Sequence, residues 1–330
     1  MAKIVLGIAT PHSPMLATPP EEWPAVMERD KLNEGSLWAS DGKPHSYAEV
    51  LTMAPPGLEK EITPEVEKQH AQANDRSLDK LSELLLAANP DVVVVVGDDQ
   101  AELLLEGNQP SILVYRGETV QNVPPDPSVV NSNWILRSRP RGFTFEETKQ
   151  LPGKADLGYH IIQWANDRGF DLASSTKLPE GQGISHAFTF VQKTLLKGKP
   201  VPTVPILMNC FFAPNQPTPK RCIELGKMLK DAIESWDSDA RVAIVASGGL
   251  SHFVVDEDLD RGFLKAIEEK DFNHMTSIPL NLLESGNSEL RNWMAVAAAV
   301  NHMKVHVMEY IPCYRSPAGT GCGMGYAWWD

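Results

Sequence analysis

The sequence is poor in the features that mark secreted, membrane and nucleic-acid-binding proteins. Its four cysteines form no Cys-x-x-Cys pair, which argues against a structural zinc site and favours reduced thiols in the cytoplasm. The longest apolar runs, such as Val92–Val96 and Met294–Val300, are far too short to span a bilayer. No apolar signal-peptide core follows Met1. We therefore expect a cytoplasmic protein that makes no use of a membrane.

Positive charge is scarce as well. The 330 residues include 30 Lys and Arg against 43 Asp and Glu, which gives a formal net charge of −13. A nucleic-acid backbone or an anionic membrane needs clustered positive charge, so neither is expected as the main partner. Two common catalytic signatures are also missing: the chain has no Walker loop, and Ser251 lacks the frame of a nucleophile elbow.

Apolar runs and helical periodicity alternate along the chain. Four apolar runs, long enough for strands covered on both faces, lie at Lys3–Ala9, Asp91–Val96, Thr203–Asn209 and Arg241–Ala246. Between them, apolar residues recur at helical spacing over 78–88, 222–233 and 289–300. This alternation predicts an α/β fold with one central, mostly parallel or mixed sheet covered by helices.

Two segments interrupt that alternation. Residues 16–76 are polar and rich in Pro and Glu, and residues 120–155 carry several prolines and charges. Apolar runs typical of strands lie on both sides of each segment, so neither is expected to link two domains. We expect a single catalytic domain over residues 1–330 with two long irregular insertions near the active site.

Polar residues follow the ends of two predicted strands. The first strand runs into His12, which is held between two prolines, and the five-valine run ends at Gly97, Asp98, Asp99 and Gln100. In α/β sheets, ligands gather beyond the carboxyl ends of strands. His12 is either a loop residue bonded to nearby backbone or a functional group. The two acids either border a metal or polar-substrate site or cap the next helix.

Two further histidines lie in glycine-rich turns. His186 follows Gly181 and Gly183, and the strand at 241–246 runs into Gly-Gly-Leu-Ser-His, which ends at His252. Paired glycines let the backbone approach a ligand closely, which favours a functional reading of His252. Glu289 begins an apolar helix, where an acid is also expected for ordinary helix capping. Among the remaining histidines, His45 is the one most open to a role.

Taken in chain order, these motifs resemble one family. The chain is similar to the class III extradiol ring-cleavage dioxygenases, the family of the catalytic subunit of protocatechuate 4,5-dioxygenase. The similarity runs through His12, His186, Gly248–His252, Ser288–Trp293 and the loop Tyr314–Gly325. Each piece is modest, but the ordered set is fairly specific and spans nearly the whole chain.

The resemblance implies a chemistry for the matched residues. Members of the family bind non-haem Fe(II) through two His and one Glu, with open positions for a catecholate and O₂. By matched motif, His12 is the first ligand and Glu289 the carboxylate. His252 is then the acid/base residue, with His186 assisting, because the pKa of an imidazole lies near the operating pH.

One position departs from the family pattern. The second iron-binding His falls on Gln100, whose amide is a poorer ligand for Fe(II) than an imidazole. Three explanations stay open: Gln100 or a neighbouring Asp is the third ligand, His45 from the first insertion replaces it, or the chain binds no metal. The retained His12, His186, His252 and Glu289 favour an enzyme.

The resemblance also implies substrate and partners. The expected substrate is a catechol-type ring, such as protocatechuate, gallate, an O-methylated derivative or a biphenyl-type diol, cleaved with O₂. Gly249, Ser251 and Arg315 are the expected substrate contacts. A homo-oligomer, specifically a homodimer, is expected, with a small helical partner subunit as an option. The alternatives are a metal-free partner subunit of a heteromeric dioxygenase and, less strongly, a metal-dependent hydrolase.

Overall fold

Four parallel strands form the centre of the structure, and they are the four runs that the sequence predicts. In the computed structural model, which describes residues 1–330, they lie side by side in the order β1 (Lys3–Thr10), β10 (Arg241–Ser247), β4 (Val92–Asp98) and β9 (Thr203–Met208). Neighbouring strands pair in parallel throughout this block. Strands buried on both faces need continuous apolar sequence, which is why they were visible in the chain.

Shorter or later strands extend the block on both sides into a mixed sheet of nine strands. Beside β9 lie β5 (Ile112–Tyr115), antiparallel to it, and β8 (Ala173–Ser175); beside β1 lies β13 (Thr320–Trp329), antiparallel to it, which pairs with β12 (Val305–Tyr314) and β11 (His252–Val254). Two small hairpins stand apart: β2 (Leu37–Trp38) with β3 (Pro44–His45), and β6 (Thr119–Asn122) with β7 (Lys149–Pro152). The predicted α/β fold with a mixed central sheet is confirmed.

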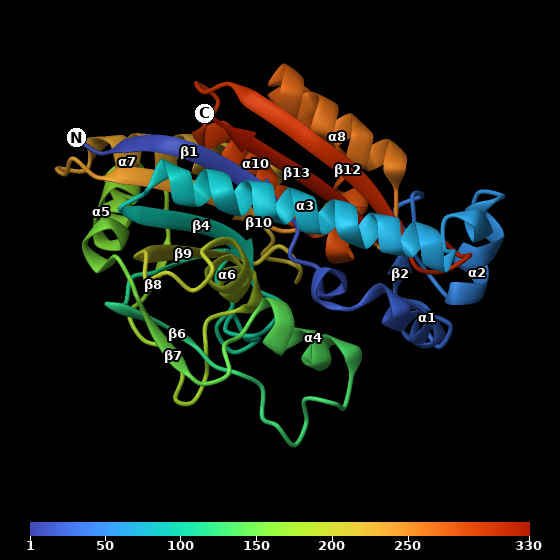
Figure 1. Cartoon of the computed structure of the whole chain (residues 1–330). Helices are drawn as coiled ribbons and strands as arrows, with labels where there is room; N and C mark the ends of the chain where they lie inside the picture. The colour runs from blue at the N-terminus through green and yellow to red at the C-terminus, as the bar shows by residue number, and fades with distance from the viewer.

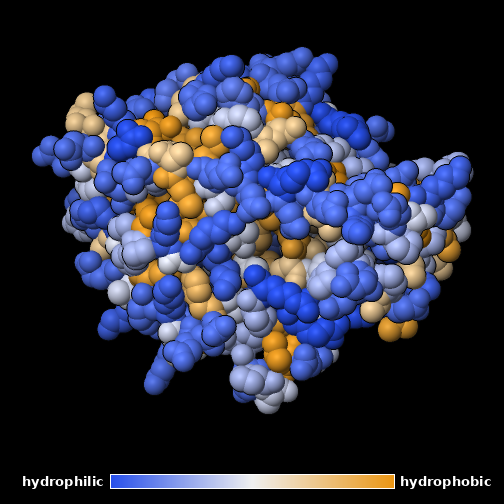
Figure 2. Space-filling view, viewed as in Figure 1, coloured by the Kyte–Doolittle hydropathy of each residue, from blue (hydrophilic) through white to orange (hydrophobic).

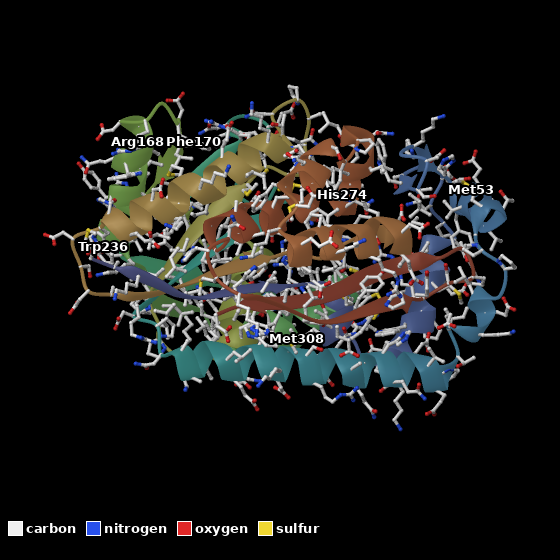
Figure 3. All side chains as sticks on the ribbon, turned by 90° about the horizontal axis from the view of Figure 1, so that it is seen from above. Met53, Arg168, Phe170, Trp236, His274 and Met308 are labelled. Carbon is white, nitrogen blue, oxygen red and sulfur yellow. The ribbon has the colours of Figure 1, made fainter.

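Helices cover both faces of the sheet. The long helix α3 (Pro64–Ala88) lies along one face, and α7 (Pro219–Ser235), α8 (Glu257–Glu269) and α10 (Leu290–Ala299) lie on the other (Figures 1 and 3). The remaining helices are α1 (Trp23–Asp30), α2 (Tyr47–Met53), α4 (Trp134–Gly142), α5 (Ala155–Asn166), α6 (His186–Phe190) and α9 (Phe272–Ser277). Several 3₁₀ segments and a π-helical turn at Val191–Leu195 join them.

The five-valine run shows how the sheet divides the core. Val92, Val94 and Val96 belong to a core of 47 residues on the α7 and α10 side, whereas Val93 and Val95 belong to a core of 29 residues on the α3 side. Successive side chains of a strand point to opposite faces, so one apolar run packs against both helix layers.

The two segments expected to be irregular contain regular structure. Residues 16–76 include α1, α2 and the first half of α3, and residues 120–155 include most of the β6–β7 hairpin and α4. Most side chains in the first turns of α3 are exposed, so no apolar stripe marked that part of the helix. The expectation of irregular insertions is therefore corrected to short helices and hairpins on the surface.

The crossovers explain where a site forms. The chain passes from β1 through α3 to β4 on one face, and from β9 through α7 to β10 on the other, so the two connections run in opposite directions across the sheet. Loops therefore separate at the carboxyl ends of β1, β10 and β4, which is the usual place for a ligand in such sheets.

The outer surface is mainly polar. Figure 2 shows hydrophilic side chains over most of the face that carries α3, with apolar side chains scattered between them. No helix combines the length and the hydropathy that a bilayer crossing requires.

Helix α8 is attached to the sheet through a buried carboxyl group. Asp260 Oδ1 accepts a hydrogen bond from the Ser251 backbone N–H at 2.7 Å, and Oδ2 accepts from Ser251 Oγ at 2.6 Å and from the Tyr310 hydroxyl at 2.7 Å. Burial raises the pKa of Asp260 to about 7; the hydrogen bonds from Ser251 and Tyr310 oppose this rise, and the charge of Asp256 adds to it.

The contact between β4 and α6 gives a first prediction. A Cβ added at Gly97 would lie 2.8 Å from the Ala187 Cβ, so Gly97→Ala must push α6 away from the strand. We expect the free energy of unfolding, measured in urea, to fall by about 1–3 kcal/mol. Gly107→Ala is the control, because a Cβ there meets no atom within 4 Å. Equal losses in the two variants would contradict the prediction.

Asp260 gives a prediction for the pH dependence of stability. Between its ordinary pKa of 3.8 and its folded value of about 7, the folded state holds a proton that the unfolded state has lost. Stability therefore falls as pH rises through that window, by roughly 1.4 kcal/mol per unit of pKa difference. Asp260→Asn should remove this slope in urea unfolding measured from pH 4 to pH 8. The exposed Asp258→Asn should keep it, and parallel pH profiles for all three proteins would refute the assignment.

Candidate active site

Three strand ends stand level at one edge of the sheet. Thr10 pairs with Ser247, and Ser247 pairs with Gly97, so the residues that follow β1, β10 and β4 emerge side by side. There they line a pocket of about 190 Å³ that also receives His186, Arg139 and Arg315. This register brings the residues that follow the strands together at one site, as the sequence predicts.

His12 presents a free nitrogen to the pocket. Its Nδ1 lies 3.0 Å from Ser247 Oγ, whose own proton is donated to the Ala187 carbonyl at 2.7 Å. Ser247 Oγ must therefore accept from Nδ1–H, which in the neutral ring leaves the lone pair on Nε2. That Nε2 is buried and has no hydrogen-bond partner.

Two buried carboxylates face this nitrogen. Asp98 Oδ1 lies 3.6 Å and Glu289 Oε2 lies 3.4 Å from His12 Nε2. Burial raises the pKa of Asp98, and the charge of Glu289 adds to the rise. Burial would also raise the pKa of Glu289, but His252 and His12 outweigh it and hold that pKa well below its ordinary value.

Neighbouring donors position the two carboxylates. Asn292 Nδ2 donates to Asp98 Oδ1 at 3.2 Å, and the Gly249 backbone N–H donates to Glu289 Oε2 at 2.6 Å. The Gln100 amide nitrogen lies 3.2 Å from both Asp98 Oδ2 and Glu289 Oε1. Gln100 therefore touches both acids through its donor end.

His186 enters the site from the first turn of α6. Its Nδ1 lies 2.5 Å from Glu102 Oε2, and its ring stands edge-on to that of His12 with the centroids 4.6 Å apart. Glu102 Oε1 also accepts from Arg139 Nη2 at 3.1 Å. Burial would lower the pKa of His186, but Glu102 raises it to about 9, and His186 and Arg139 in turn bring the pKa of Glu102 to about 2 despite its burial.

His252 adjoins the other side of Glu289. Its Nδ1 donates to the Leu250 carbonyl at 2.9 Å, and its Nε2 lies 3.0 Å from Glu289 Oε1. Burial would lower the pKa of His252, but the Glu289 carboxylate outweighs it and raises that pKa well above its ordinary value. Because Nδ1–H is fixed on a carbonyl, Nε2 is the atom at which His252 can hold or release a proton.

The adjacent acids Asp98 and Asp99, for which the sequence left two roles open, make different contacts in the structure. Asp98 faces the pocket histidines, whereas Asp99 accepts backbone N–H groups from the turn at Glu102, Leu103 and Leu104 and the Ser185 hydroxyl. Asp98 is thus a site residue. Asp99 holds the turn after β4, and because no helix follows it, the alternative of a helix cap is wrong.

Two expected site residues, the candidate ligand His45 and the substrate contact Ser251, are corrected, and a third, Arg315, reaches the pocket but is engaged by another side chain. His45 lies on the β2–β3 hairpin, where its Nε2 is 3.1 Å from Asp41, and it does not line the pocket. Ser251 is fully buried on Asp260 and does not line the pocket either. Arg315 does line it, but its guanidinium is bound through two nitrogens to Asp30, at 2.7 and 3.1 Å. Its charge is already balanced.

Sequence reasoning missed Glu102 and Arg139. Glu102 lies just beyond the Asp98–Gln100 motif, and Arg139 lies in the segment judged irregular. Trp134 and Ile135, on the same helix α4 as Arg139, supply apolar wall to the pocket. No linear pattern marks these residues, because only the folded chain brings α4 to the strand ends.

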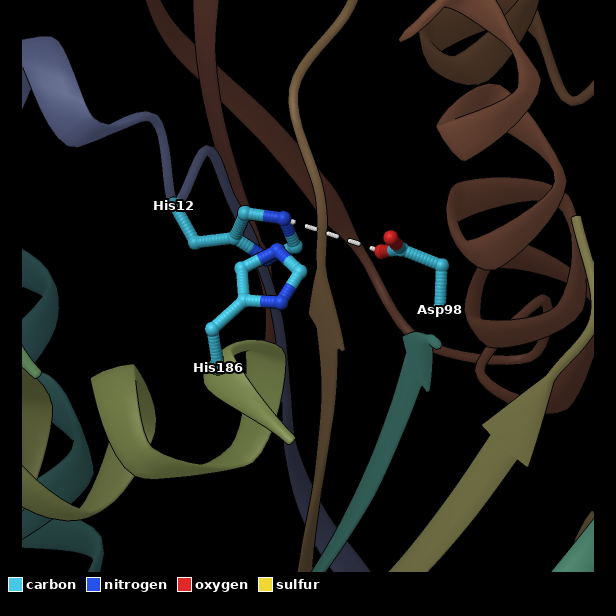
Figure 4. Close-up of side chains that lie close together, drawn as sticks. All are labelled: His12, Asp98 and His186. Carbon is cyan, nitrogen blue, oxygen red and sulfur yellow. Dashed lines mark ion pairs between the residues drawn. The ribbon is translucent and has the colours of Figure 1, made fainter. Parts of the chain in front are cut away.

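The donor set fits a divalent cation. One ligand atom each from His12, Asp98 and His186 lies within 4.8 Å of the others, and Figure 4 shows the three side chains converging from separate elements. Metal–nitrogen and metal–oxygen bonds of about 2 Å set ligands on opposite sides of an ion about 4 Å apart. Imidazole and carboxylate ligands with open positions are typical of non-haem Fe(II). The unpartnered His12 Nε2 is the atom that such an ion would satisfy.

The chain is similar in sequence to known aromatic ring-opening dioxygenases. A gallate dioxygenase from Pseudomonas putida KT2440 is 38% identical over 105 residues, which are 31% of this chain and 29% of that enzyme. The aligned part is thus less than a third of the relative's length. A family model described as the catalytic LigB subunit of aromatic ring-opening dioxygenase matches residues 50–323, most of the chain. The resemblance stated from the motifs is confirmed, and the chain belongs to the family of catalytic LigB subunits of aromatic ring-opening dioxygenases.

Proposed function

We propose that the chain is a non-haem Fe(II)-dependent extradiol dioxygenase that opens a catechol-type ring with O₂. The observation that carries the proposal is the unpartnered, buried Nε2 of His12 opposite the carboxylates of Asp98 and Glu289, with His252 beside Glu289. Membership of the family and the gallate dioxygenase relative support the reaction class.

His12 and Glu289 would hold the iron, as the resemblance implies. An iron held there would supply a Lewis acid that lowers the pKa of the diol and a source of electron density for O₂. In extradiol cleavage the bond between a hydroxylated carbon and its neighbour outside the diol breaks. Both oxygen atoms of O₂ enter the product, so no external reductant is needed.

The protein residues supply the proton handling and the wall. His252 lines the pocket, and its Nε2 is the atom that would hold the proton exchanged with the substrate during the reaction. Trp134, Ile135 and Phe253 offer apolar surface to an aromatic ring and exclude water from it.

The homodimer and the small helical partner subunit expected from the resemblance, and the cytoplasmic location expected from the sequence, remain predictions. Helix α4 of the chain itself lines the pocket through Trp134, Ile135 and Arg139, so part of the cover is intramolecular.

The proposal is tested by turnover and by one substitution. Protein reconstituted anaerobically with Fe(II) should take up O₂ and form a yellow ring-fission product with a catechol. His252→Gln should lower kcat by about 10²–10⁴-fold with iron content unchanged, the range typical of a lost acid/base group. The exposed His274→Gln, on α9 and outside the pocket, is the control (Figure 3).

A negative result is equally definite. Iron-loaded wild-type protein that consumes no O₂ with protocatechuate, gallate, their O-methyl ethers or biphenyl-type diols would contradict the proposed function. Full activity in His252→Gln would contradict the role given to that residue.

The pocket also favours a carboxylated diol. Arg315 is bound through two guanidinium nitrogens to Asp30, whereas Arg139 lines the pocket and is bound to Glu102 through Nη2 alone. A substrate carboxylate would bind the guanidinium N–H groups of Arg139 that remain free.

We therefore expect Arg139→Met to lower kcat/KM for protocatechuate by about 10–100-fold more than for unsubstituted catechol, since a hydrogen bond to a charged group contributes roughly 1.5–3 kcal/mol. Comparing two substrates cancels any effect transmitted through Glu102. Arg141→Met is the matched control, because Arg141 lies on the same helix but pairs with Glu22 outside the pocket. Equal losses for both substrates would show that Arg139 does not bind the carboxylate.

A further inference from the structure

The second imidazole of the site is missing from the position where the family motif requires it. Gln100 stands there, and the sequence left Gln100, a neighbouring Asp and His45 as candidates for the vacant role. The structure offers a different histidine. His186 lies across the pocket from His12, with their ring centroids 4.6 Å apart.

We propose that His186 supplies the second imidazole ligand and Asp98 a second carboxylate beside Glu289, with Gln100 outside the coordination shell. This inference rests on the proposed function only in assuming that the pocket takes a divalent metal. It assigns a ligand set of two imidazoles and two carboxylates drawn from four separate parts of the fold.

The first argument is proximity. Ligand atoms of His12, Asp98 and His186 lie within 4.8 Å of one another, close to the largest separation of about 4 Å between donors on one ion. Glu289 lies next to this group, with its Oε2 3.4 Å from His12 Nε2.

The second argument is orientation. A metal-binding histidine usually donates its outer ring N–H to a carboxylate, carbonyl or hydroxyl, which fixes the ring and the tautomer. Glu102 accepts from His186 Nδ1 at 2.5 Å, and Ser247 accepts from His12 Nδ1 at 3.0 Å. In both rings the outer nitrogen is engaged, which leaves Nε2 for the ion.

The third argument is that the other candidates are engaged elsewhere. The Gln100 amide nitrogen contacts both Asp98 and Glu289 at 3.2 Å, and a flipped amide would set its oxygen against two carboxylates. Its donor end is therefore the end that faces the site, and an amide N–H₂ does not bind a metal. His45 is bound to Asp41 on the β2–β3 hairpin.

The fourth argument is charge. Asp98 and Glu289 are buried side by side at 0% and 1% exposure, and buried like charges need compensating positive charge. His252, 3.0 Å from Glu289, compensates that carboxylate. The hydrogen-bond donors to Asp98 are the uncharged amides of Asn292 and Gln100, and a dication among these four side chains would balance the second carboxylate.

The experiment measures metal binding. Apo-protein is titrated anaerobically with Fe(II) by calorimetry, and retained iron is measured by elemental analysis after desalting. Wild type should retain about one iron per chain, as a single pocket site implies. His45→Ala should bind Fe(II) as wild type does, and Gln100→Ala, which removes only an outer partner of the two carboxylates, should weaken binding by no more than about 10–100-fold. His186→Ala and Asp98→Asn should each weaken binding by more than the roughly 10–100-fold typical of losing an outer partner.

Glu102→Gln is a second variant that tests the role of His186 without removing its imidazole, in case His186→Ala does not fold. It keeps His186 in place but removes its orienting carboxylate, so Fe(II) affinity should fall by about 10–100-fold. Circular dichroism checks that each variant is folded. Wild-type affinity in folded His186→Ala, a loss in Gln100→Ala as large as that in His186→Ala, or no iron in the wild type would each overturn the inference.

A ring-cleavage assay on the same samples separates the two proposals. Iron held through His186 without cleavage of any diol would contradict the proposed function alone. Ring cleavage together with iron that does not depend on His186 would contradict this inference alone.

Discussion

The site depends on two carboxylates buried next to each other at the end of a parallel sheet. Asp98 and Glu289 are 0% and 1% exposed, and each would be strongly unfavourable as an isolated buried charge. Hydrogen bonds from Asn292, Gly249 and Gln100 satisfy some of their lone pairs, but none of these donors carries a charge. The surrounding imidazoles, together with the metal that we propose, would provide the positive charge that neutral donors lack.

The need to balance two buried carboxylates explains the contacts of the neighbouring side chains. His252 lies 3.0 Å from Glu289 and adjoins the pocket, so one group both stabilises a buried carboxylate and handles protons. Glu102 and Arg139 form a second ion pair that balances and orients His186. The acids and bases of the pocket thus form two connected clusters, one around Glu289 and one around Glu102.

The sequence predicted the central strands and the strand-exit residues because both depend on local pattern. A strand buried on both faces needs continuous apolar residues, and the five-valine run is divided between two cores. Glycines and prolines then mark where such a strand ends. The short strand β8 and helix α4 were missed, since they bury few side chains and carry no period of their own.

Contacts between distant residues were beyond prediction, and they decide what several candidates do. Arg315 is held by Asp30, 285 positions away, and His186 by Glu102, 84 positions away. Ser251, which was expected to contact the substrate, instead donates a hydrogen bond to Asp260 of α8. The sequence shows which hydrogen-bond donors and acceptors a residue carries, but only the fold decides whether they already have partners.

Gln100 shows why a site must be judged by its arrangement and not by one motif. Considered alone, the replacement of an iron-binding histidine by an amide suggests that the metal is lost. In the folded chain, however, the same strand exit also carries Asp98, and His186 reaches the pocket from α6 with its outer nitrogen fixed by Glu102. A buried imidazole nitrogen without a partner, facing two acids, is costly unless something positive lies between them. The geometry around His12 therefore argues that metal binding has been rearranged around Gln100, because a chain that had lost its ion would leave His12 Nε2 and the paired carboxylates without physical purpose.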